Sequence, residues 1–181
     1  MTTLGTTTWL LAAAFATGAG VLDWRSRRIP NWYTIPGALA GIAINSMAYG
    51  VHGARSALAG IVLGLLLLLP LVALGGLGGG DWKLMGALGA FTGPWHLLRV
   101  LAVTVFVNAA MALAMIIRKR RLLETLQNMG YILLSLVTFR PPLVRMTLDN
   151  PDLVKVPFGV AAAAATVGYT IYVLGYALGG S

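Results

Sequence analysis

Two aspartates, Asp23 and Asp81, stand next to long apolar segments, where a carboxyl group can do chemistry. The other three acidic residues fall in a polar segment where solvation accounts for them: Glu124, Asp149 and Asp152. A carboxylate in or near the hydrocarbon of a membrane costs about 2.5–3.5 kcal/mol on insertion scales, so such a residue is a functional candidate. The alternative is that each aspartate lies in the lipid headgroup layer, balanced by a neighbouring Arg or Lys.

Two carboxyl groups in one site of low dielectric constant cannot both ionise easily, so they share a single proton. Such a pair supplies a general base and a general acid together. The base activates a water molecule for attack on a peptide carbonyl, and the acid polarises the carbonyl oxygen and later protonates the leaving amine. If Asp23 and Asp81 meet, the sequence therefore predicts an intramembrane aspartic protease.

A glycine-rich stretch that includes Gly78 and Gly80 precedes Asp81. Glycine costs a helix about 1 kcal/mol relative to alanine, but it permits bends and close contact between backbones. We expect Asp81 to be the N-cap of the helix that follows, where the helix dipole favours its charge. Lys83 has two interpretations: it tunes Asp81 or holds substrate backbone, or it extends to the membrane edge as an anchor.

Basic residues at 25–28 follow Asp23, and Ile-Pro-Asn follows them at 29–31. Arg25 and its neighbours are interpreted chiefly as topology signals, because Lys and Arg collect in cytoplasmic loops. Asn31, which comes directly after Pro30, is expected to be a helix N-cap.

Membrane-spanning helices must position both aspartates. Of the 181 residues, 58% are hydrophobic and only 10% are charged, whereas a soluble domain carries roughly 25% charged residues. A spanning helix needs about 20 apolar residues. The sequence therefore predicts an all-α integral membrane protein with about six transmembrane helices, at residues 9–22, 32–51, 57–77, 82–92, 96–117 and 156–178.

The fourth predicted helix is short, since it follows the glycine-rich loop and ends at Gly93 and Pro94. Its length of about 17 Å would let Asp81 lie below the membrane surface. Both dense basic clusters, at 25–28 and 118–121, fall in the cytoplasm if both termini lie outside it. The same orientation places both aspartates on the cytoplasmic side.

Residues 118–155 are predicted to form a cytoplasmic or interfacial loop within a single membrane domain that covers 1–181. Its Leu-rich stretch, 131–139, is expected to be a helix lying at the interface, with a re-entrant segment as the alternative. The residues themselves indicate no role for 122–150.

Several classes of site and partner are disfavoured. The chain has no cysteine, which excludes disulfides, thiolate zinc sites and a cysteine nucleophile. His52 and His96 are expected across the bilayer from both aspartates, and a zinc hydrolase needs about three protein ligands, so no metal or other cofactor is expected. The net charge of +8 is interpreted as a topology signal and as a source of lipid contact rather than nucleic-acid binding.

Three stretches make the chain resemble the prepilin peptidases, the aspartic peptidases that process type IV pilin and pseudopilin precursors. Residues 23–31 match the pattern of Asp, a basic residue, then Ile-Pro-Asn, and residues 78–84 match Gly-x-Gly-Asp-x-Lys-Leu. The third stretch, 155–159, carries less weight, because Val160 stands where the family often has proline. Both aspartate motifs occur in order, and the resemblance covers nearly the whole chain.

The resemblance implies that Asp23 and Asp81 are the catalytic pair. It implies a prepilin substrate whose basic leader lies in the cytoplasm and whose apolar helix lies in the bacterial inner membrane, usually cut after a glycine at the boundary. Further residues of the matching motifs are then expected to support catalysis or position substrate: Gly78, Gly80, Lys83, Arg25, Pro30 and Asn31.

Longer members of that family carry a cysteine-containing insertion and also N-methylate the new terminus. This chain has neither cysteine nor a soluble insertion before Asp81, so it resembles the short, single-activity members that serve tight-adherence (Flp-type) pilus systems. The resemblance implies a protease without methyl transfer, with the pilus assembly machinery as a further candidate partner.

Two other functional classes stay open. Paired intramembrane carboxylates carry protons or cations in small transporters. A transporter would place its acids near the bilayer midplane, often in repeated halves, and no repeat is evident here. The other class is a structural subunit of a secretion complex.

Overall fold

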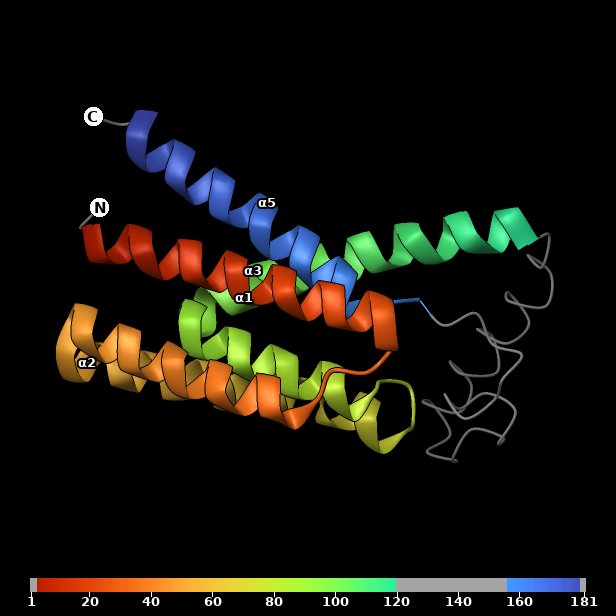
Figure 1. The fold of residues 1–181 in the computed structure, drawn as a ribbon, viewed down its shortest axis with the longest axis horizontal. Coiled ribbons are helices and arrows are strands. Elements are labelled where there is room, and N and C mark those ends of the chain that lie inside the picture. Colours follow the sequence, from red (N-terminus) through yellow and green to blue (C-terminus); the bar gives the residue numbers. More distant parts are fainter. Residues whose placement is uncertain (1–2, 120–155, 180–181) are drawn as a thin grey trace.

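The computed structural model describes residues 3–119 and 156–179, and this part of the chain is entirely helical. It forms four helices (Figure 1): α1 (Thr3–Ser26), α2 (Asn31–Ala73), α3 (Gly79–Lys119) and α5 (Phe158–Gly179). All four are long and apolar enough to cross a membrane, so the protein is an integral membrane protein. From residue 120 onward, the loop predicted at 118–155 and its Leu-rich stretch lie outside the described residues.

The prediction of six helices is wrong, because two predicted pairs of spans form two long helices that bend at a glycine. Helix α2 replaces the predicted spans 32–51 and 57–77, and it changes direction at Gly50, where φ is 59° and ψ is −139°. Helix α3 likewise replaces the fourth and fifth spans and bends at Gly93, where φ is 71°. Glycine adopts such a positive φ without steric cost, so each of these long elements consists of two helical segments joined at a non-helical glycine.

Contacts between α2 and α3 show how far α2 turns at Gly50. Gly41 packs against Ala90, and Gly60 packs against Gly89. In a straight helix Gly41 and Gly60 would lie about 28 Å apart. Because they contact adjacent residues of α3, α2 must double back along it (Figure 1). Small residues at these contacts let the helix backbones touch.

Asn45 stabilises the bend in α3. Its side-chain amide donates hydrogen bonds to the carbonyl oxygens of Ala90 and Phe91, at 2.7 and 2.9 Å. In a straight helix the carbonyl of Ala90 would accept from the residue four positions later, which is Pro94 and has no N–H. Asn45 is buried, and it therefore supplies from α2 the donor that the proline lacks.

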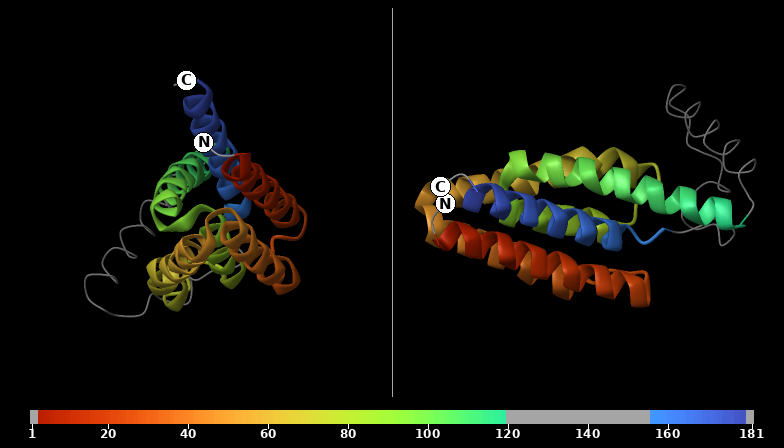
Figure 2. Two further views of the ribbon diagram at one scale, coloured as in Figure 1. Left: turned by 90° about the vertical axis from the view of Figure 1, so that its left-hand side faces the viewer. Right: turned by 90° about the horizontal axis from the view of Figure 1, so that it is seen from above.

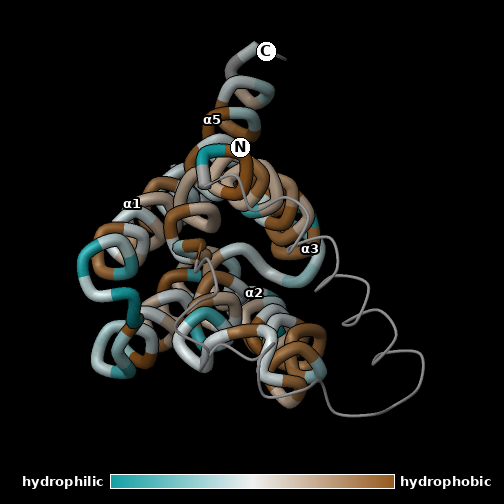
Figure 3. Tube along the Cα trace, turned by 90° about the vertical axis from the view of Figure 1, so that its right-hand side faces the viewer, coloured by the Kyte–Doolittle hydropathy of each residue, from teal (hydrophilic) through white to brown (hydrophobic). Residues whose placement is uncertain are grey.

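Both chain ends lie at one end of the molecule, and the two aspartates lie at the other. The start of α1 and the end of α5 are neighbours, while the end of α1 and the start of α3 lie together at the opposite end (Figures 1 and 2). We call this opposite end the aspartate end. Figure 3 looks onto it and shows the hydrophilic connection between α1 and α2.

The core of the described helices is small and lies where α3 crosses its neighbours, around Leu84, Leu88 and Leu97. Many large apolar side chains point outward instead, and Trp32 and Phe106 are 68% and 77% exposed. A water-soluble protein would hide much of this surface, whereas lipid solvates it.

Candidate active site

Asp23 lies in the last turn of α1 and is buried against α5, with only 5% of its surface exposed. The backbone N–H of Gly159 donates a hydrogen bond of 2.8 Å to its Oδ2 atom. A Cβ added at Gly159 would lie 2.8 Å from Asp23 Cβ, and one added at Gly20 would lie 2.8 Å from the Cβ of Ala163. The absence of side chains at both glycines therefore lets α5 approach Asp23 closely.

Asp81 lies in the first turn of α3. Its expected role as N-cap is wrong, because α3 begins two residues earlier, at Gly79. The first turn still favours an acidic side chain, since unpaired N–H groups and the helix dipole concentrate positive charge there. A Cβ added at Gly78 would lie 3.0 Å from Asp81 Oδ2, so glycine keeps the space beside this carboxyl group open.

Two contacts join the segments that carry the aspartates. Lys83 Nζ donates a hydrogen bond of 2.9 Å to Asn31 Oδ1. The backbone of Ile29 lies against Gly80, where an added Cβ would come 3.0 Å from the Ile29 carbonyl oxygen. The structure thus brings both sequence motifs together at the aspartate end.

Asn31 does not cap α2, contrary to the sequence prediction. Helix α2 starts at Asn31, and Pro30 occupies the cap position with extended backbone (φ −77°, ψ 154°) and no side-chain hydrogen bond to the helix. The Asn31 side chain instead accepts a hydrogen bond from Lys83. Neither sequence interpretation of Lys83 included this contact, because the two residues are 52 positions apart.

The arginines that follow Asp23 have different structural roles, and the expected supporting role of Arg25 stays a prediction. Arg27 adopts a left-handed conformation, with φ of 52°, which ends α1 and turns the chain. Arg25 lines a groove between α1 and α5. Since three of the four residues at 25–28 are arginine, the sequence alone could not separate them.

Sequence reasoning also gave too little weight to Gly159. The signal was present, because this glycine ends the third matching stretch at 155–159. Its hydrogen bond to Asp23 joins residues 136 positions apart, from the first and last described helices. Only the folded arrangement shows that this stretch meets the first aspartate motif.

The two histidines lie far from the aspartates. Both line a polar cavity of about 330 Å³ that also contacts Thr8. Thr8 and Asp23 are separated by about 22 Å along α1, at a rise of about 1.5 Å per residue. His96 Nδ1 lies 2.9 Å from the hydroxyl oxygen of Tyr169. His52 and His96 therefore lie toward the opposite end of the molecule, as the sequence predicted.

Comparison with known proteins gives one match. The sequence model of the type IV leader peptidase family matches residues 9–117. This match covers more than half of the chain and includes both Asp23 and Asp81, but ends before Gly159. No curated protein and no solved structure matches the chain.

Proposed function

Because the chain belongs to the type IV leader peptidase family, we propose that it is an aspartic endopeptidase that removes the basic leader of prepilins. The family itself indicates a peptidase with prepilin-like substrates. The aspartic mechanism and the narrower substrate class are the additional parts of the proposal. One observation supports them: the segments that carry Asp23 and Asp81 lie together at the aspartate end, where Lys83 binds Asn31 and Ile29 packs against Gly80.

In the proposed reaction, Asp23 and Asp81 hold one proton and one water molecule between them. The ionised carboxylate takes a proton from the water as its oxygen attacks the carbonyl carbon of the scissile peptide. The protonated carboxyl group gives its proton to the carbonyl oxygen, and a tetrahedral diol forms. The protonated carboxyl group of the pair then gives its proton to the amide nitrogen as the C–N bond breaks. The other carboxylate takes a proton from a hydroxyl of the diol, so that the carboxylic acid and amine products leave and the pair again holds one proton.

We place the enzyme in the bacterial inner membrane with the aspartate end toward the cytoplasm and both termini outside it. The C-terminal ends of α1 and α3 point toward the same side of the molecule, with α3 extending farther (Figure 1), and they carry Arg25 and Arg118. Basic residues stay on the cytoplasmic side of a membrane. A precursor whose basic leader is cytoplasmic would then present its membrane boundary to the two aspartates.

The substrates we propose are Flp-type prepilins or pseudopilins, which this enzyme cuts without methylating the new N-terminus. The support is the sequence itself, which contains no cysteine and no soluble insertion between the end of α2 and Asp81. The pilus assembly machinery and membrane lipids are its proposed partners.

Co-expression with an Flp-type prepilin, followed by N-terminal sequencing and mass measurement of the product, tests the function. Cleavage should be lost in Asp23→Asn and in Asp81→Asn, each alone, with the amount of membrane-inserted protein unchanged. These variants keep the shape of the side chain but remove the ability to exchange a proton, so retained cleavage in either one would refute the shared-proton mechanism.

Two further measurements separate this proposal from its rivals. His52→Ala and His96→Ala should leave cleavage intact, because both histidines lie toward the opposite end from the aspartates. A loss of cleavage in both would favour a metal-dependent peptidase. The mature product should carry an unmodified amino terminus, and a mass increase of one methyl group would show that the proposed single activity is wrong.

A further inference from the structure

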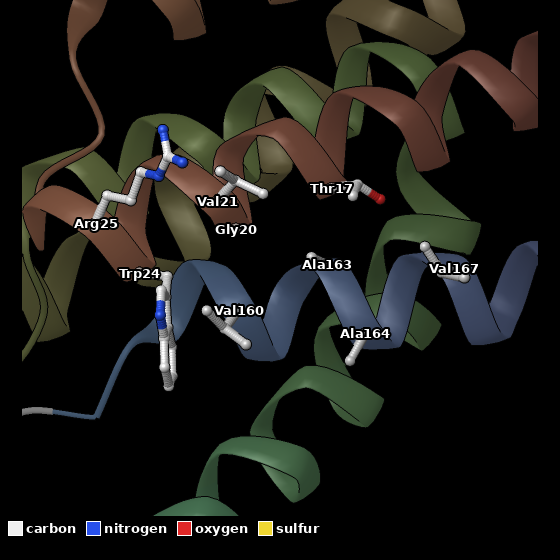
Figure 4. A pocket seen from close by; sticks show the side chains of 9 residues that line it. All are labelled: Thr17, Gly20, Val21, Trp24, Arg25, Val160, Ala163, Ala164 and Val167. Atoms are coloured by element: carbon white, nitrogen blue, oxygen red, sulfur yellow. The ribbon is translucent and has the colours of Figure 1, made fainter.

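A lateral groove of about 470 Å³ runs between α1 and α5 (Figure 4). Trp24 and Val160 lie at one end of it, and Thr17 and Val167 lie at the other. Val21 and Trp24 are exposed on the flank of the molecule, at 49% and 64%. The groove therefore opens sideways, on the surface that lipid solvates.

One end of this groove lies beside the Asp23–Gly159 contact, although neither aspartate is among its lining residues. Gly20 lies on the α1 side of the groove. Because it has no side chain, Ala163 of α5 can approach α1 closely there. Trp24 follows Asp23 directly, and Val160 follows the glycine whose N–H binds the Asp23 carboxyl group. A helix that lies along the groove would therefore have one of its ends beside Trp24 and next to Asp23.

The charge of the lining indicates which part of a precursor fits. Among the described residues that line it, Arg25 at the Trp24 end is the only charged one, and the other lining side chains are apolar apart from Thr17. A charged leader would gain nothing from this apolar lining. An uncharged apolar helix matches the lining. A precursor embedded in the same membrane would also reach this lipid-facing surface as such a helix.

We propose that the groove between α1 and α5 binds the apolar membrane helix of the substrate and thereby delivers the peptide bond at the end of that helix to Asp23. This inference rests on the proposed function and adds to it the route of entry. The substrate enters sideways from the lipid, while its leader stays at the aspartate end.

The length of the groove limits how much of the substrate helix is recognised. From Thr17 to Arg25, α1 rises about 12 Å, which is about two turns of an α-helix. Only the two turns of substrate helix nearest the cut would therefore be held. Side chains on one face of those turns, spaced three or four residues apart, would contact the enzyme.

Photo-crosslinking tests this placement directly, with benzoylphenylalanine introduced at Ala164 in the Asp23→Asn background. Ala164 is exposed and lines the groove. Ala14 is the matched control, because it is an exposed alanine that lines a groove of the same volume, about 470 Å³, between α1 and α2. A co-expressed Flp-type prepilin should crosslink at position 164 and not at 14, through the first two turns of its membrane helix.

Three crosslinking results would overturn the proposal: no prepilin adduct at position 164, equal adducts at both positions, or lipid adducts alone at 164. The result does not depend on turnover, since the Asp23→Asn variant is used. It therefore tests the groove even if the chain proves not to cut prepilins.

Cleavage kinetics provide a second, independent readout. Ala164→Phe should raise the KM for prepilin about tenfold, equivalent to about 1.4 kcal/mol of binding, with kcat little changed. Ala14→Phe should leave both parameters at wild-type values. Wild-type cleavage with an unaffected Ala164→Phe variant would refute the groove alone, whereas no cleavage by the wild type would refute the proposed function.

Discussion

Replacing Gly159 with alanine should lower kcat and should also reduce the stability of the contact between α1 and α5. The new Cβ would lie 2.8 Å from Asp23 Cβ and 3.1 Å from its Oδ2 atom. The nearest atom is bonded directly to the Asp23 backbone, so it cannot swing away as the tip of a long side chain would. Either α5 retreats from α1 or the carboxyl group rotates, and both movements lengthen the hydrogen bond from the Gly159 N–H.

The expected loss follows from the strength of that bond. A hydrogen bond to a charged group contributes about 1.5–3 kcal/mol. At about 1.4 kcal/mol per factor of ten, losing it from the reacting arrangement lowers kcat about 10- to 150-fold. Alanine is the better helix former by about 1 kcal/mol, so the helix itself should not weaken.

Gly168→Ala is the matched control, because it lies on the same helix and an added Cβ there would contact nothing within 4 Å. Leader cleavage by both purified variants would be measured with one prepilin, alongside thermal unfolding. The control should keep wild-type kcat. Wild-type kcat in Gly159→Ala, or an equal loss in both variants, would refute the argument that Gly159 positions Asp23.

Two other predictions concern contacts between helices. The Lys83–Asn31 hydrogen bond is exposed, so its contribution should be small. A double-mutant cycle with Lys83→Met and Asn31→Ala should give a coupling energy of about 0.5–1 kcal/mol in kcat/KM. Strictly additive losses would mean that the bond plays no part in the reaction. Asn45→Ala leaves the buried carbonyl groups of Ala90 and Phe91 without their hydrogen-bond donor. This loss should lower the free energy of unfolding by about 1–3 kcal/mol, measured by reversible unfolding. Unchanged stability would show that water replaces the amide.

Charge patterning predicts that both aspartate motifs lie on the same side of the membrane, but it does not predict that they meet. Positive charge after the first apolar run and after the fifth sets the orientation, and the same orientation places Asp23 and Asp81 at one side. The structure agrees, since Ile29 packs against Gly80 and Lys83 binds Asn31. Charge patterning thus predicted the side of the site but none of its contacts.

The number of helices was not predictable from apolar runs alone. Gly50 stands in a chain with 23 glycines, and most of them serve helix packing, such as Gly41 and Gly60. Which glycine adopts a positive φ depends on the contact between α2 and α3. The sequence marked Gly93 and Pro94 as a break, but it did not show that Asn45 would supply the donor needed there.

Contacts between distant segments explain the other differences. The sequence around Asn31 favours an N-cap, and the side chain binds Lys83 instead because α3 brings that ammonium group alongside. Gly159 was given too little weight because Val160 stands where the family often has proline, which weakened the match at 155–159. The backbone N–H of Gly159 nevertheless makes the hydrogen bond to Asp23. The motif at 155–159 marked this glycine, but it did not show which residue the glycine N–H would bind.

The hydrogen bond between Asp23 and Gly159 has a consequence for biosynthesis, because it spans 136 positions. Chains fold from the N-terminus as the ribosome releases them, so α1, α2 and α3 can assemble while α5 is still to be made. Until α5 enters the membrane, Asp23 lacks its backbone donor and the groove has only one wall. Under the proposed mechanism, a nascent chain would therefore not cleave precursors until α5, the last described helix, is in place.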